Sequence, residues 1–437
     1  MNTDILALVK ARKNRLINCR RDLHKHAEAA WTEFRTASIV AETLTRLGYQ
    51  VSVGEEVINA EVMMGVPSRQ ELISHQERAI AQGADPEWVG KMQGGKTGVM
   101  GVLHFTQPGP VVAFRFDMDA NDVLEAASEE HRPWREGFAS VNSGAMHACG
   151  HDGHTSIGLT LAEVLAEAKK ELAGTVKLIF QPAEEGVRGA KAMVARGIVD
   201  DVDFFVGLHL GIGLKKIGIM TCNTVGFLAT TKLDAVYTGV PAHAGAAPET
   251  GHNALLAAAA AALNLHAISR HSQGASRINV GVMQAGTGRN VIPDKAVLKL
   301  ETRGTTSEIN EYMYKRARTI LEAAAAMYEV KLDLSPMGGA ANCENTPALV
   351  ARLQQVAEES NLFDSILPEG NIGGSEDCTY FMERVQQKGG QVAYLMVGTE
   401  LAAGHHDSRF DFAEESLVTA TALLSKAAVE LLSKKNL

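Results

Sequence analysis

The chain has few cysteines, no dense cluster of lysine and arginine, and no long apolar run. Its five cysteines are scattered through 437 residues, and an odd, dispersed set does not form the framework of a small disulfide-linked protein. Such cysteine usage is typical of a reducing compartment. The most apolar run, residues 254–265, is mostly alanine and is shorter than the roughly 20 residues that span a bilayer. We therefore expect no membrane as a partner.

The charge balance argues against nucleic acid as a partner. The formal net charge is -9 at pH 7, and an acidic chain without a basic cluster gains no general attraction to a phosphate backbone. The first residues, MNTDILALVKARKNRLINCRRD, contain no long apolar stretch of the kind that marks a signal peptide. We expect a cytoplasmic globular protein, and its length favours two domains.

Four short apolar runs have the composition of strands that are buried on both faces. They are VVAFRF, TVKLIF, DFFVGL and QVAYLMV, at residues 111–116, 175–180, 203–208 and 391–397. Apolar residues at helical spacing lie between the first two, from Ile157 to Leu172. This alternation predicts an α/β sheet with parallel strands. Ahead of it, residues 4–48 have a helical pattern, and residues 55–92 are interpreted as a helical insertion that packs on the main body.

The stretch from about residue 225 to residue 336 has a different order of elements. Its pattern predicts strand, helix, two strands, helix and strand, at residues 232–237, 253–269, 277–284, 295–303, 307–327 and 329–334. The order βαββαβ is that of a ferredoxin-like domain. The predicted organisation is a catalytic domain at 1–224 and 337–437, into which a small domain at 225–336 is inserted.

Polar side chains that carry chemistry follow each predicted strand of the larger domain. The first run leads to Asp117 and Asp119, the second to Glu184 and Glu185, the third to His209, and the fourth to His405 and His406. Ligands of open α/β sheets bind beyond the carboxyl ends of the strands. We therefore expect these side chains to meet at one edge of the sheet.

The segment HACGHDGHT, at 147–155, adds three histidines, a cysteine and an aspartate just before a predicted helix. An isolated histidine or cysteine is more often a packing residue than a ligand. The whole set of imidazole, thiolate and carboxylate groups indicates a site for zinc, manganese, cobalt or nickel. The residues alone do not separate the ligands from the supporting histidines.

Several motifs resemble those of a metallopeptidase family that includes aminoacylases, hippurate hydrolases, indole-acetyl-amino-acid hydrolases and glutamate carboxypeptidases. They are RRDLHKHAEAAWTEFRTA, FRFDMDA, MHACGHDGHT, FQPAEEG, GLHLG, PAHAGAAPETGHNAL, GTGRNVIP, GGSEDCTYF and GHHDSRF. They cover nearly the whole chain in order. The resemblance implies a zinc-peptidase-like α/β catalytic domain with an inserted ferredoxin-like lid, through which members dimerise.

The resemblance also implies roles for particular residues of the larger domain. The metal ligands would be Cys149, His151, Glu185, His209 and His406, holding two divalent ions, with manganese first and zinc, cobalt or nickel as alternatives. Glu184 would be the general base. Asp119 would orient a ligand histidine. His147 and His154 would support the site.

The lid carries further residues that match the family. His243 would stabilise the oxyanion in the active site of a partner molecule, although a turn histidine on the lid surface is the simpler alternative. Asn290 would contact the substrate. Arg289 would grip a glutamate carboxylate in bidentate fashion, or would be an ordinary solvent-facing arginine.

The substrate implied by the resemblance is an N-acyl amino acid. The insertion at 55–92 and GTGRNVIP resemble the branch that hydrolyses p-aminobenzoyl-glutamate to p-aminobenzoate and glutamate. A hippurate hydrolase or another N-acyl-amino-acid amidohydrolase is the alternative of the same chemistry. A binding module without turnover is the alternative of another class, and the intact Glu184 argues against it. The partner in the dimer would be a second copy, a related second subunit, or both.

Overall fold

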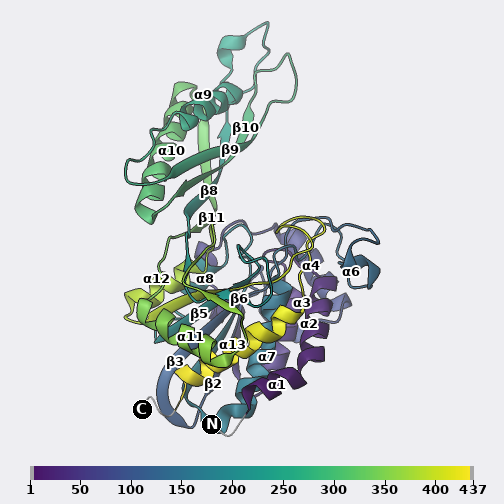
Figure 1. Cartoon of the computed structure of the whole chain (residues 1–437). Helices are drawn as coiled ribbons and strands as arrows, with labels where there is room; N and C mark the ends of the chain where they lie inside the picture. Colours follow the sequence, from purple (N-terminus) through teal and green to yellow (C-terminus); the bar gives the residue numbers. More distant parts are fainter. Residues whose placement is uncertain (1–3, 434–437) are drawn as a thin grey trace. The chain divides into compact units, whose positions relative to one another are not determined.

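The computed structural model describes residues 4–433, which divide into two compact units (Figure 1). The first, here the catalytic unit, contains the residues up to Val225, Cys343–Ile372 and those from Asp377 on. The second, here the lid unit, contains Gly226–Asn342 and Gly373–Glu376. The inserted unit therefore extends beyond the expected boundary at residue 336. The reason is that its last strand, β11 (Lys331–Ala340), continues past Pro336 after a register shift.

The catalytic unit is built on one sheet of eight strands in the order β1-β2-β4-β3-β5-β14-β6-β12. Their bounds are Gln50–Val53, Val99–His104, Ala173–Gln181, Gln107–Asp117, Phe204–Leu210, Gln391–Val397, Ile219–Thr221 and Ser365–Leu367. The four predicted strands lie side by side at the centre, as β4, β3, β5 and β14, and they are parallel. The parallel arrangement expected for these four strands is therefore confirmed, while the antiparallel pairs β1-β2, β2-β4 and β14-β6 make the whole sheet mixed. The short strands β7 (Thr224–Val225) and β13 (Gly370–Asn371) form a separate pair.

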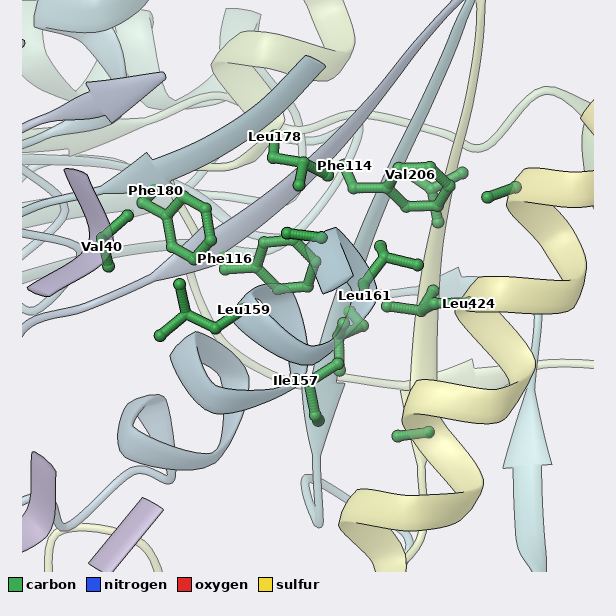
Figure 2. Close-up of a cluster of buried hydrophobic side chains, with 14 of the residues drawn as sticks. Val40, Phe114, Phe116, Ile157, Leu159, Leu161, Leu178, Phe180, Val206 and Leu424 are labelled. Atoms are coloured by element: carbon green, nitrogen blue, oxygen red, sulfur yellow. The ribbon is translucent and has the colours of Figure 1, made fainter. Parts of the chain in front are cut away.

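Helices cover both faces of this sheet, which is why its central strands are rich in apolar residues on both faces. On β3, the alternate residues Val112, Phe114 and Phe116 face the core that contains α7 (His151–Ala168) and α13 (Glu415–Leu431). Figure 2 shows Phe114, Phe116 and Phe180 above α7 in this cluster. α11 (Pro347–Ser360) joins the same core. The other face meets α12 (Thr379–Gln387), whose Phe381 stacks on Phe205 of β5, and α12 in turn packs against α8 (Ala190–Val194).

The first helical region is broken into three helices, where the sequence pattern predicted a helical stretch from residue 4 to residue 48. They are α1 (Ile5–Ala11), α2 (Lys13–Lys25) and α3 (Phe34–Arg46). The break before α3 contains Trp31, whose φ of 67° is incompatible with a continuing right-handed helix. The insertion is helical only in α4 (Arg69–Ala81) and α5 (Pro86–Lys91), apart from two single 3-10 turns at 54–56 and 60–62. A short helix, α6, spans Arg132–Arg135.

The lid unit has the βαββαβ order expected from its pattern. Its elements are β8 (Ala229–Thr238), α9 (Ala254–His266), β9 (Ser276–Ala285), β10 (Lys295–Gly304), α10 (Ser307–Met327) and β11. The strand order is β11-β8-β10-β9, with every neighbouring pair antiparallel. Both helices pack on one face of this sheet around Tyr237, Leu298 and Leu321. The expected fold class is confirmed. None of the described helices, in either unit, has the length and apolarity to cross a bilayer.

The packing of α7 on the sheet predicts the effect of one added methyl group. A Cβ at Gly158 of α7 would lie 2.6 Å from Cδ2 of Phe116 and 2.8 Å from Cε1 of Phe180. We expect Gly158→Ala to destabilise the catalytic unit by about 1–3 kcal/mol through overpacking, measured as a lower midpoint of thermal or urea unfolding.

The matched control is Gly90→Ala in α5, because no heavy atom lies within 4 Å of a Cβ at Gly90. That change should be neutral or stabilising by up to about 1 kcal/mol, since alanine is the better helix former. Equal shifts in the two variants would show that the helix does not approach the ring pair as described.

Candidate metal centre

The carboxyl ends of the four central strands bring the candidate residues to one edge of the catalytic sheet. In the parallel register, Asp117 at the end of β3 lies opposite Gln181 at the end of β4. His209, near the end of β5, lies opposite Met396 of β14. α7 begins at His151 on this edge, directly after Gly150, whose φ of 90° favours glycine.

The structure brings the predicted ligands into one continuous cluster. Five groups of side chains among the described residues have their ligand atoms within 4.8 Å of one another, and three of them contain at least two predicted ligands: Cys149, His151 and His209; Cys149, Glu185 and His406; and His151, Glu184 and Glu185. These three groups share Cys149, His151 and Glu185. Thiol, imidazole and carboxylate donors from separate stretches of chain therefore meet in a mostly buried space.

Two buried atoms in this cluster make no hydrogen bond within the described residues, His151 Nε2 and Glu185 Oε1. His151 Nδ1 donates a hydrogen bond of 2.9 Å to the carbonyl oxygen of Asp119, so in the neutral ring Nε2 is the nitrogen that is left to bind a metal. His406 Nε2 lies 3.4 Å from Glu185 Oε1. His406 belongs to the loop that follows β14, at residues 398–414, which is called the last ligand loop below. Buried polar atoms are rarely left without partners. A cation between them would satisfy both, so the residues present fit a metal site.

The surroundings of His209 favour its neutral ring, which is the form that binds a metal. Burial, with the neighbouring rings of His154 and His405, lowers the pKa of His209 well below its usual range. Its Nδ1 donates 2.8 Å to the carbonyl oxygen of Leu210, which leaves the Nε2 lone pair directed at Cys149 Sγ, 3.5 Å away. Fixing one ring nitrogen through a backbone carbonyl is how proteins set the tautomer of a metal-binding histidine.

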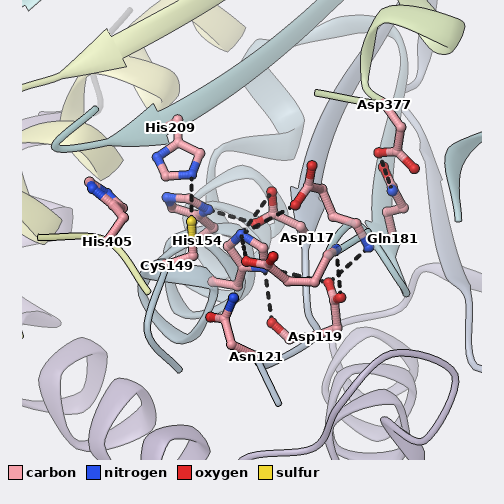
Figure 3. A network of polar contacts seen from close by, with 12 residues as sticks. Asp117, Asp119, Asn121, Cys149, His154, Gln181, His209, Asp377 and His405 are labelled. Atoms are coloured by element: carbon pink, nitrogen blue, oxygen red, sulfur yellow. Dashed lines mark hydrogen bonds and ion pairs between the residues drawn. The ribbon is translucent and has the colours of Figure 1, made fainter. Parts of the chain in front are cut away.

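The two adjacent histidines of the last loop have different surroundings. The neighbouring side chains of Cys149 and Glu185 raise the pKa of His406 to about 10, so a cation that bound between these groups would displace a proton from the ring. The backbone of His406 is anchored through its amide, which donates 2.7 Å to the carbonyl oxygen of Ala148. His405 instead turns its Nε2 to the carbonyl oxygen of Leu210, at 3.3 Å, and lies at the side of the network in Figure 3.

Asp119 fixes the loop that carries Glu184 and Glu185. Its carboxylate accepts the amide of Glu184 at 3.0 Å and the amide of Glu185 at 2.8 Å. Its Oδ1 also lies 3.4 Å from His151 Nδ1. Asp119 therefore sets the backbone of the two glutamates, and its carboxylate lies beside the ring of His151. The side chain of Glu184 is largely buried, with Oε2 3.9 Å from His151 Nε2.

The remaining two histidines of HACGHDGHT differ from the ligand set. His154 uses both ring nitrogens within the protein, since Nδ1 donates 2.6 Å to Asp117 and Nε2 accepts 3.1 Å from the amide of Leu210. His147 is buried, and burial lowers its pKa to about 3, but it belongs to none of the donor groups found among the described residues.

Sequence reasoning placed Asp117 at this edge without giving it a role, and it missed two further residues that hold the edge together, Arg20 and Glu33. Asp117 is ion-paired with Arg115 at 2.6 Å and bound to His154. The fully buried guanidinium of Arg20 joins α2 to Asp152 beside His151, at 2.8 Å, and to Asp411 in the last ligand loop, at 2.9 Å. Glu33 accepts the amide of Ala183, one residue before the proposed base. Arg20 and Glu33 lie inside the motif RRDLHKHAEAAWTEFRTA, which signalled the family but not a role for either residue.

The three candidate residues of the lid lie in the other unit. His243, Arg289 and Asn290 are all exposed, and the segments of His243 and Asn290 are neighbours, because the Ala244 amide donates 3.0 Å to the carbonyl oxygen of Asn290. His243 Nδ1 accepts from the amides of Gly245 and Ala246, each at 3.1 Å. Its proton is therefore on Nε2, which is available as a donor.

Comparison with known proteins gives consistent matches. Residues 113–430 match the protein family described as "Peptidase family M20/M25/M40". One chain of the p-aminobenzoyl-glutamate hydrolase of Escherichia coli strain K12 is 52% identical over 95% of both sequences. An indole-3-acetyl-aspartic acid hydrolase of Enterobacter agglomerans is 52% identical over 94% of both. The crystal structure of an aminobenzoyl-glutamate utilization protein from Klebsiella pneumoniae superposes with a TM-score of 0.84 at 42% identity, covering all of both chains.

The adjacent histidines allow a direct test of the ligand assignment. We expect His406→Ala to weaken binding of divalent metal by more than about tenfold, since even loss of a residue that only supports a ligand costs 10–100-fold. The matched change His405→Ala should leave metal binding close to that of the unchanged protein. The readout is the metal content after dialysis, measured by elemental mass spectrometry. Loss of metal from His405→Ala together with retention of metal by His406→Ala would refute the assignment.

Proposed function

Because the chain belongs to the peptidase family M20/M25/M40, we propose that its candidate metal centre hydrolyses the amide bond of an N-acyl acidic amino acid, with p-aminobenzoyl-glutamate as the first substrate. The family expected from the sequence motifs is confirmed, and the chain is a metal-dependent amidohydrolase. The observation that carries the proposal is the convergence of five donors beside one further carboxylate, Glu184.

The substrate class follows from two relatives of equal similarity. One is named for p-aminobenzoyl-glutamate and the other for indole-3-acetyl-aspartate, and each is 52% identical to this chain. The two named compounds share an aromatic acyl group and a dicarboxylic amino acid. We place p-aminobenzoyl-glutamate first because the solved Klebsiella structure also belongs to an aminobenzoyl-glutamate protein. Indole-3-acetyl-aspartate is the second candidate, and acyl-glycines such as hippurate are less favoured.

The proposed metal ligands are the five residues predicted from the sequence: Cys149, His151, Glu185, His209 and His406. Five donors exceed the four of a tetrahedral ion, which supports a pair of divalent ions. Manganese is our first choice, and the thiol and imidazole donors also suit zinc, cobalt or nickel. When bound, such ions polarise the scissile carbonyl and make a water molecule more acidic.

Glu184 is the proposed general base. Its carboxylate takes a proton from the attacking water, whose oxygen bonds to the amide carbon. The same carboxyl group then returns the proton to the amide nitrogen as the carbon–nitrogen bond breaks. The products are a carboxylic acid and a free amino acid. Asp119 supports this role by holding the backbone amide of Glu184.

The lid is proposed to bind the substrate and to form the dimer. The Nε2–H of His243 can donate a hydrogen bond to the oxyanion that forms on the substrate. Asn290 can contact the same substrate, because its segment is hydrogen-bonded to the segment that carries His243. Exposed Leu263 of α9 and Met283 of the edge strand β9, with 76% and 53% of their surface accessible, support pairing through this unit.

The proposed partner in this dimer is a second copy of the chain or a related second polypeptide. The name of the Escherichia coli relative describes that protein as one subunit of its enzyme, which supports the second possibility. The proposed location is the cytoplasm, because all five cysteines carry free thiols, as is typical of a reducing compartment.

The base is tested by removing its carboxylate. We expect Glu184→Ala to retain metal and to lower kcat by about 10²–10⁴-fold, the usual contribution of general acid–base catalysis. Hydrolysis of p-aminobenzoyl-glutamate is followed by release of p-aminobenzoate. Glu61→Ala, at an exposed position of the insertion, is the control and should keep full activity. Turnover by Glu184→Ala at the rate of the control would remove the proposed base.

Substrate selection is tested at Arg289. A guanidinium that grips the side-chain carboxylate of glutamate should make Arg289→Ala raise KM for p-aminobenzoyl-glutamate by about tenfold. KM for p-aminobenzoyl-glycine, which lacks that carboxylate, should change little. Arg289→Lys keeps the charge and should recover only part of the loss, because an ammonium cannot bind in bidentate fashion. An equal rise in KM for both substrates would rule out the proposed contact.

A further inference from the structure

A fully buried carboxyl group, that of Glu33, lies immediately before α3 and reaches the loop that carries the proposed base. Glu33 Oε1 accepts the amide of Trp31 at 3.0 Å and the amide of Ala183 at 2.8 Å. Its Oε2 accepts the hydroxyl of Thr97 at 2.6 Å. One side chain therefore links three segments that are distant in the sequence.

The link to Ala183 matters because of the backbone at that point. Ala183 has a φ of 53°, a left-handed conformation that residues with a Cβ rarely adopt. Such a conformation persists only when the surroundings hold it. The next two amides, those of Glu184 and Glu185, are held by Asp119. Two buried carboxyl groups thus fix three consecutive amides, and the proposed base is the middle residue of the three.

We propose that Glu33 is a positioning residue for the amide hydrolysis assigned above: by holding the Ala183 amide it determines where the carboxylate of Glu184 stands. This inference rests on the proposed role of Glu184 as base. Glu33 does not belong to any of the donor groups of the described residues, so its effect passes through the backbone of the loop.

The environment of Glu33 indicates which substitution should replace it. Burial, together with the nearby charge of Asp119, raises the pKa of Glu33 to about 8, so a neutral side chain suits the site. In Glu33→Gln, the amide oxygen can accept the Trp31 and Ala183 amides, and the NH₂ group can donate to Thr97. Glu33→Ala leaves the Ala183 and Trp31 amides without this acceptor.

Glu28 provides a matched control within the same motif. It is equally buried, and its carboxylate accepts the amides of Arg35 and Thr36 and the guanidinium of Arg78. It therefore supports the start of α3 and the insertion, but its side chain does not bind the loop at 182–187. Glu28→Ala tests the general cost of losing a buried carboxylate from this region.

The experiment compares Glu33→Ala, Glu33→Gln, Thr97→Val and Glu28→Ala in the full-length, metal-saturated protein. We expect Glu33→Ala to lower kcat by about tenfold or more with KM within about twofold, because small displacements of a catalytic group are costly. Glu33→Gln should restore kcat to within about threefold. Thr97→Val, which removes one of the three donors, should lower kcat by a smaller factor. Glu28→Ala should keep kcat per folded molecule.

Hydrogen exchange of the backbone gives a second readout that needs no turnover. The peptide that spans 181–189 should exchange faster in Glu33→Ala than in Glu28→Ala, and Glu33→Gln should restore protection. If Glu33→Ala fails to fold, Thr97→Val and Glu33→Gln still report on the same contact. The proposal is overturned if exchange and kcat are unchanged in Glu33→Ala and Thr97→Val, or if Glu28→Ala matches Glu33→Ala in both. A protein that hydrolyses no acyl amino acid, yet shows the expected exchange, would refute the proposed function and leave the positioning contact in place.

Discussion

The catalytic unit depends on one electrostatic constraint, which is that imidazole, thiol and carboxylate donors are confined together at the edge of a sheet. Leaving a buried polar atom without a partner costs about 1–3 kcal/mol, and both His151 Nε2 and Glu185 Oε1 lack hydrogen bonds within the described chain. Burial also raises the pKa of the Cys149 thiol, which opposes formation of the thiolate. Divalent cations held by His151, Glu185 and Cys149 would remove these costs together, since they would accept the lone pairs and favour the thiolate.

Hydrogen bonds and ion pairs from the surrounding fold hold the loops of this cluster in place, despite the cost of burying its polar atoms together. Asp119 and Glu33 hold the amides of the loop at 183–185, while Arg20 joins α2 to the start of α7 and to the last ligand loop. Each of these contacts joins residues that are at least 65 positions apart in the sequence. The first helices are therefore as much a part of the site as the strands that deliver its side chains.

Much of this arrangement could be predicted from the sequence, because strong periodicity and strand-end chemistry are local signals. The four central strands, the order of the lid elements and the cluster of donors could all be read from runs such as VVAFRF and HACGHDGHT. Other features depend on tertiary contacts. The break at Trp31, the antiparallel edge strands and the extension of β11 to Ala340 follow from backbone conformation and strand pairing. His147 and His154 differ because the fold supplies hydrogen-bond partners to both ring nitrogens of His154, whereas neither ring nitrogen of His147 has one among the described residues.

The central claim, that these donors enclose a pair of divalent cations, is tested most directly by anomalous diffraction from crystals soaked in manganese. The account predicts two peaks, each within coordination distance of side chains from the set Cys149, His151, Glu185, His209 and His406, with the carboxylate of Glu184 beside them. Ordered manganese elsewhere on the molecule, with these five side chains free of it, would contradict the account.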